Sequence, residues 1–103
     1  MKSLESIFQA AKGDLAQYMT AQLKYNASQS NWPSSAIDGV AVNFDGTSLN
    51  LGISDEAYDT VMTQEYGTER VRPTSVLRRT SNMSYDFEKY FIERMNKRLR
   101  STL

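Results

Sequence analysis

Apolar residues between Ser3 and Lys24 recur at steps of three and four, the spacing that places side chains along one face of an α-helix. The members of this stripe are Leu4, Ile7, Phe8, Ala11, Leu15, Tyr18, Met19 and Leu23. We therefore expect an amphipathic helix over residues 3–24 whose stripe packs against the core. Gly13 lies inside this helix, where it costs about 1 kcal/mol relative to alanine.

The segment Asn26–Ser35 has no periodicity and is rich in asparagine and serine, which favours a loop. It carries the only tryptophan, Trp32, followed by Pro33. Two interpretations of Trp32 stay open. Either the indole folds back onto the core as a lid, or it is an anchor that inserts into a partner.

Residues 39–53 give the clearest β signal, because apolar residues alternate on both sides of Asp45-Gly46. An Asp-Gly pair in this position predicts a hairpin with a two-residue type I′ turn. The cross-strand pairs expected from that turn are Phe44 with Thr47, Val42 with Leu49, and Val40 with Leu51. Ile53 would then lie outside the apolar face. A lone hairpin is marginal in water, so we expect this face to pack on the N- and C-terminal helices.

Helical spacing returns in residues 55–66, where Ser54 is the predicted N-cap and Gly67 is placed to end the helix. A polar connector, Thr68–Thr74, follows. From Ser81 to about Arg100 a second apolar stripe predicts a long final helix. This order predicts an α+β fold in which an N-terminal helix, a short helix and a long C-terminal helix pack on one face of a small antiparallel hairpin.

The composition predicts one domain, residues 1–103, without catalytic chemistry. The chain has no cysteine and no histidine, which removes disulfides, thiolate nucleophiles, the commonest zinc ligands and the usual general base. It contains no phosphate loop, dinucleotide fingerprint or nucleophile elbow. We therefore expect no enzyme activity, no metal and no cofactor. No stretch approaches the roughly 20 apolar residues of a membrane span, and the N-terminus has no signal-peptide pattern, so we expect no membrane association.

The charge is zero overall but unevenly spread. Residues 1–68 hold 3 basic and 8 acidic groups, and residues 69–103 hold 9 basic and 4 acidic groups. The candidate interface charges are Asp55, Glu56 and Asp59 on the acidic side and Arg70, Arg72, Arg78 and Arg79 on the basic side. Lysines such as Lys12 and Lys24 are expected on exposed helix faces. Complementary surfaces on one chain predict head-to-tail contacts between copies, which close into a ring when the geometry allows.

The segment around Gly67 has a structural interpretation of its own. Gly67 can supply a left-handed helix stop, and Pro73 can fix the start of the last helical region. Glu65 lies where its carboxylate can hydrogen-bond the connector or pair with Arg70 or Arg72.

The same segment resembles a known family. The run Tyr58-Asp-Thr-Val-Met-Thr-Gln-Glu65-Tyr66-Gly67-Thr68, followed by Arg72-Pro73 and Val76-Leu77-Arg78, resembles the head-to-tail joining (neck and tail-completion) proteins of tailed bacteriophages. Members carry a helix ending in Glu-aromatic-Gly-Thr, a variable loop, an Arg-Pro element and a C-terminal helix. The match covers about Tyr58–Leu99. Where the family usually has a second proline and a phenylalanine before the leucine, this chain has Thr74-Ser75-Val76.

The resemblance implies a structural virion protein without catalysis. It implies a ring, a hexamer or dodecamer, at the neck or the head-proximal end of the tail, joining portal or adaptor to tail-tube and terminator proteins and making non-specific contact with DNA in the channel. Assembly would take place in the cytoplasm of the bacterial host. On this interpretation Trp32 and the acidic and basic candidates form the interfaces. The alternative is a small nucleic-acid-binding regulator that uses the basic C-terminal third, against which the sequence pI of about 6.2 argues.

Overall fold

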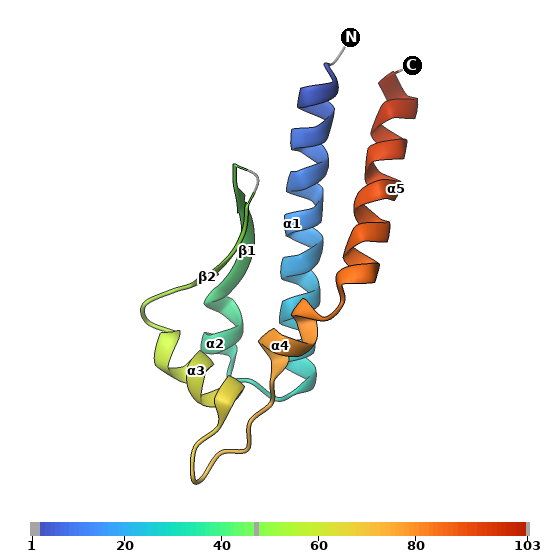
Figure 1. Ribbon diagram of the computed structural model, residues 1–103. Helices are drawn as coiled ribbons and strands as arrows, with labels where there is room; N and C mark the ends of the chain where they lie inside the picture. Colours follow the sequence, from blue (N-terminus) through green and yellow to red (C-terminus); the bar gives the residue numbers. More distant parts are fainter. Residues whose placement is uncertain (1–2, 47, 103) are drawn as a thin grey trace.

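The computed structural model describes residues 3–46 and 48–102, and this part of the chain has the predicted α+β fold (Figure 1). Its elements are α1 (Leu4–Gln29), α2 (Ser34–Asp38), β1 (Val40–Asp45), β2 (Ser48–Ile53), α3 (Tyr58–Tyr66), α4 (Val76–Ser81) and α5 (Ser84–Thr102). In Figure 1, α1 is a central column with the β1–β2 hairpin beside it on one side and α5 on the other. The two termini lie at one end, and the connector between α3 and α4 lies at the opposite end.

Helix α1 is longer than the sequence pattern predicts. It begins at Leu4 after Ser3, whose side-chain oxygen accepts a hydrogen bond from the amide of Ser6 at 3.1 Å. The helix continues to Gln29 because Ala27, which is fully buried, extends the apolar stripe by one turn. The predicted loop over Asn26–Ser35 is therefore wrong at both of its ends, since α1 takes its first four residues and α2 takes its last two.

The core lies at the C-terminal end of α1, where α2, β1, α3 and α4 meet it. Its buried members are Leu23, Ala27, Trp32, Ala36, Val40, Ala57, Val61 and Val76. Each of these five helices and strands contributes at least one of these side chains. Trp32 and Ala57 come from the short segments that precede α2 and α3. The other half of α1 carries α5, so the molecule measures 56 × 24 × 20 Å. Its radius of gyration, 15.9 Å, exceeds the roughly 13 Å of a compact chain of this length.

The hairpin forms, but its register differs from the predicted one. The pairs are Val40 with Ile53, Ala41 with Gly52, Val42 with Leu51, Asn43 with Asn50, Phe44 with Leu49, and Asp45 with Ser48. Asp45 is thus the last residue of β1, and Gly46, with φ +63°, lies in the turn that follows it. Thr47, which the sequence paired with Phe44, lies outside the described residues. This shift by two positions preserves both faces of the ribbon and adds Ile53 to the apolar one, which explains why this register is preferred.

The short helix and the connector also differ in detail from expectation. Helix α3 begins at Tyr58 because residues 55–57 form a turn, and no side chain caps its start. Gly67 ends α3 with φ +79° and ψ 173°, a positive-φ extended conformation rather than a left-handed helical stop. A Cβ at Gly67 would lie 2.8 Å from the Pro73 ring and from the carbonyl oxygen of Val71, so this position requires glycine on two grounds.

The predicted final helix, Ser81 to about Arg100, forms as α5, and a short helix that the sequence did not predict, α4, precedes it. Helix α4 begins three residues after Pro73, behind Ser75 in a left-handed conformation, so the proline does not start it. Helix α5 packs along α1, where Tyr18 stacks on Tyr90 with ring centroids 4.1 Å apart and Phe8 meets Phe91 edge-on at 5.6 Å. The hairpin packs on α1 through β1, whereas the sequence also predicted packing on the C-terminal helix.

Candidate functional site

Three side chains on one face of α1 hold the hairpin and α2 through backbone groups. Lys12 donates to the carbonyl of Gly46 at 2.7 Å, and Lys24 donates to the carbonyl of Ile37 at 2.8 Å. Between them, the hydroxyl of Thr20 donates to the carbonyl of Val42 at 3.2 Å and accepts from the amide of Val42 at 2.8 Å. Their spacing of eight and four residues places them on one face.

The expectation that Lys12 is exposed is wrong. Its residue surface is only 4% exposed, and its ammonium lies 5.1 Å from the ring centre of Phe8 and 5.4 Å from that of Phe44. Helical periodicity shows that Lys12 lies near the edge of the apolar stripe, but the tip of the hairpin covers it, and that contact is not local in sequence. Lys12 therefore anchors the hairpin tip to α1.

An apolar groove runs along α1 between the hairpin and α5. It consists of three adjoining pockets of about 190, 240 and 430 Å³. Their apolar lining includes Phe8, Leu15, Met19 and Leu23 from α1, Val42, Phe44, Leu49 and Leu51 from the hairpin, and Phe87 and Phe91 from α5. Leu49 and Leu51 are each 44% exposed. The groove is thus an apolar surface that nothing in the described part of the chain covers.

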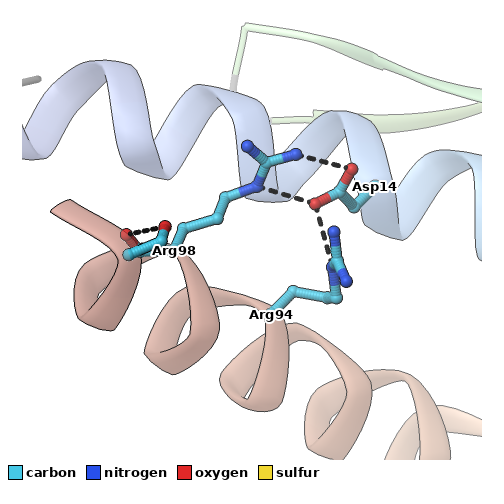
Figure 2. A network of polar contacts seen from close by, with 4 residues as sticks. Asp14, Arg94 and Arg98 are labelled. Carbon is cyan, nitrogen blue, oxygen red and sulfur yellow. Dashed lines mark hydrogen bonds and ion pairs between the residues drawn. The ribbon is translucent and has the colours of Figure 1, made fainter.

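Asp14 clamps α5 to α1 on another face (Figure 2). Its Oδ2 accepts from Nε of Arg94 at 3.1 Å and from Nε of Arg98 at 2.8 Å, and its Oδ1 accepts from Nη2 of Arg98 at 2.9 Å. The hydrogen bonds from Arg98 are the main reason that the pKa of Asp14 lies below its ordinary value of 3.8, although burial of the carboxylate opposes this shift. The cluster is a structural clamp between two helices.

The sequence leaves two roles open for Glu65, a hydrogen bond to the connector or an ion pair with Arg70 or Arg72. The residue is 4% exposed, and its carboxylate accepts from the amides of Leu77 at 2.7 Å and Arg78 at 3.1 Å. These amides belong to the first turn of α4, so Glu65 caps that helix from α3 and does not pair with Arg70 or Arg72. The neighbouring Tyr66 is exposed, and the hydroxyl of Thr68 accepts from the amides of Arg70 and Val71. The motif from Glu65 to Thr68 therefore shapes the connector.

Trp32 belongs to the core. It is 4% exposed, and its indole Nε1 donates to the hydroxyl of Thr74 at 2.8 Å, which in turn donates to the carbonyl of Gln64 at 2.8 Å. The structure therefore supports the lid interpretation and contradicts the interpretation of Trp32 as an anchor for a partner. The reason is that α1 and α2 turn back on each other around the indole.

The acidic candidates form one exposed group, which we name the acidic surface: Asp55 and Glu56 in the turn before α3, and Asp59 in its first turn. Arg70 and Arg72 on the connector and Arg78 on α4 are also exposed, and we name them the arginine surface. Within residues 3–46 and 48–102, the side chains of both surfaces have no ion-pair partner.

Arg79 differs from the other arginine candidates. Its Nη2 donates to the hydroxyl of Ser30 at 2.6 Å, and its Nε donates to the carbonyl of Thr74 at 3.2 Å. The side chain braces α4 against the end of α1. We therefore leave Arg79 out of the arginine surface.

The described residues contain no group of three acidic side chains arranged to hold a metal ion. None of their helices is both long and apolar enough to cross a bilayer. No protein-family model matches the chain, and comparison with curated proteins and with solved structures gives no match either. The resemblance to phage joining proteins therefore stays a prediction.

Proposed function

We propose that this protein is a structural component of a tailed-phage virion, located at the neck or the head-proximal end of the tail, that acts by ring assembly rather than by catalysis. The observation that carries the proposal is the pair of complementary surfaces left unpaired in one chain. The acidic surface and the arginine surface lie on different elements, so each can meet the opposite surface of a neighbouring copy. Such heterologous contacts generate rings when the rotation between copies closes.

The geometry around Glu65 gives a physical reason for the motif. Glu65 caps α4, and Gly67 allows the chain to turn against Pro73, so both fix the path of the connector. The connector carries Arg70 and Arg72. On this proposal the motif residues support the interface without entering it, and the joined partners are portal or adaptor proteins on one side and tail-tube or terminator proteins on the other, around the DNA channel.

Charge reversal tests the proposal. Replacing Arg70 and Arg72 by glutamate should abolish self-association, because two arginines that face acidic residues of the next copy become acidic themselves. Adding Asp55→Lys and Glu56→Lys to the same chain should restore it, since the exchanged surfaces are complementary again. The matched control reverses Lys89 and Lys97, which are exposed on α5. Sedimentation velocity at low and high salt reports the assembly, and incorporation into particles reports the function.

The alternative, a nucleic-acid-binding regulator, is favoured by the same unpaired arginines. It predicts a different result for the variant in which all four charges, those of Arg70, Arg72, Asp55 and Glu56, are reversed. Replacing arginines by glutamates would abolish DNA binding, and new lysines on α3 would not restore it at the original site. DNA binding that falls steeply with salt, together with a monomeric chain at all salt concentrations, would contradict the ring proposal.

A further inference from the structure

The two edges of the hairpin are not equivalent, because α1 closes only one of them. The hydroxyl of Thr20 bonds both the carbonyl and the amide of Val42, so these backbone groups point away from β2. Val42 and its partner Leu51 then form a non-hydrogen-bonded pair, in which both residues direct their backbone groups outward. The bond from the amide of Ser54 to the carbonyl of Gly39 fits the same alternation.

The outer edge of β2 is consequently open. By the alternation of an antiparallel ladder, Leu49, Leu51 and Ile53 direct their amides and carbonyls away from β1. None of these groups has a partner elsewhere in the part of the chain that the structure describes. Exposed edges are usually protected by a charge, a proline or a bulge, and Ser48–Ile53 has no charged residue and no proline.

The surroundings of this edge are acidic. Asp45, the last residue of β1, is paired with Ser48 at one end of β2, and Asp55 and Glu56 follow the other end of β2; all three acidic residues are exposed. Between Lys24 and Arg70 the chain has no lysine or arginine and contains seven acidic residues. A partner for this edge must therefore bring basic groups.

We propose that the outer edge of β2 accepts an extended segment of a partner protein that is apolar at alternate positions and basic at both ends. Its backbone would bond Leu49, Leu51 and Ile53 as a third strand. Its apolar side chains would extend the face of Leu49 and Leu51 over the groove, and its basic ends would meet Asp45 on one side and Asp55 with Glu56 on the other. This assignment does not depend on ring formation.

A second copy of the chain does not fit this edge. Because α1 closes the edge of β1, copies could pair only β2 with β2. Antiparallel pairing of β2 with β2 about Leu51 would bring the Ser48 end of one strand, beside which Asp45 lies on β1, to the Ile53 end of the other, which Asp55 and Glu56 follow. Like charges that face each other are unfavourable, so the charge pattern selects a basic segment rather than β2 of a second copy.

The test uses the full chain and a defined peptide in which valine and threonine alternate, with two lysines at each end. We expect saturable binding by fluorescence anisotropy and slower hydrogen exchange at the amides of Leu49, Leu51 and Ile53. N-methylation of the central peptide amides should weaken binding more than tenfold, because several backbone bonds are lost while the charge is kept. A peptide with glutamates at its ends should bind more weakly still.

Protein variants test the charge argument separately. Asp55→Lys with Glu56→Lys should weaken binding of the lysine-ended peptide about tenfold, as the loss of two exposed ion pairs predicts. Glu5→Lys with Glu93→Lys, on the exposed faces of α1 and α5, is the matched control and should leave it unchanged. Four results would overturn the assignment: no binding at millimolar peptide, equal binding of the N-methylated or glutamate-ended peptide, protection outside β2, or a dimer of the free chain with the β2 amides already protected.

Discussion

Replacing Glu65 by glutamine tests the most specific structural role found in the motif. The carboxylate accepts two backbone hydrogen bonds from α4 in a buried position. Glutamine keeps one acceptor oxygen but turns an NH₂ group toward either the amide of Leu77 or that of Arg78, so one buried amide loses its partner. Hydrogen bonds to a charged group contribute about 1.5–3 kcal/mol each, and the remaining neutral bond about 1 kcal/mol. We therefore expect a loss of about 2–5 kcal/mol in the free energy of unfolding.

Urea unfolding followed by far-ultraviolet circular dichroism measures this loss, and hydrogen exchange locates it. The amides of Leu77 and Arg78 should exchange faster in the variant at denaturant concentrations well below the transition. Glu69→Gln is the matched control, because Glu69 is exposed on the connector, and its effect should stay within about 0.5 kcal/mol. Equal stabilities of Glu65→Gln and Glu69→Gln would refute the capping role of Glu65.

Three further substitutions test the rest of the scaffold by the same unfolding measurement. Gly13→Ala should raise stability by about 0.5–1 kcal/mol, since an added Cβ meets nothing within 4 Å; a loss would mean that this face is covered. Lys12→Met should cost about 1–2 kcal/mol through the lost bond to Gly46 and speed exchange at the hairpin tip, whereas unchanged exchange would show that the tip is held otherwise. Asp14→Asn should cost about 1 kcal/mol at pH 7. Because the pKa of Asp14 is lowered in the folded chain, its contribution is present above 3.8 and disappears as the pH falls through the folded pKa. The difference in stability between the two chains should therefore shrink as the pH falls below 3.8, and a constant difference would contradict the clamp with Arg98.

The sequence predicts the elements well where periodicity is strong and their ends poorly. In the sequence the apolar stripe of α1 ends at Leu23, because the segment from Asn26 onward is rich in asparagine and serine, which normally favour turns. In the structure Ser28 and Gln29 are exposed, the side-chain amide of Asn26 donates to the hydroxyl of Thr80 on α4 at 2.9 Å, and Ala27 fills the core. A five-residue helix such as α2 has too few positions to show a period at all.

The register of the hairpin and the roles of single polar residues depend on contacts far apart in sequence. The Asp-Gly signal places the hairpin correctly, but only the packing of Ile53 opposite Val40 selects the turn one residue later. In the sequence, nothing distinguishes Lys12 and Glu65 from ordinary exposed charged residues of a helix. In the structure both are buried, Lys12 under the hairpin tip and Glu65 against the start of α4. The charge asymmetry, in contrast, is a property of the sequence itself.

The most direct test of the proposed function is an electron cryomicroscopy reconstruction of the neck of the phage particle to which the proposal assigns this chain. The account predicts a closed ring of copies around the DNA channel, with the acidic surface of each copy (Asp55, Glu56 and Asp59) against the arginine surface of the next (Arg70, Arg72 and Arg78). A particle that lacks the chain, or a ring in which these two surfaces face solvent, would contradict it.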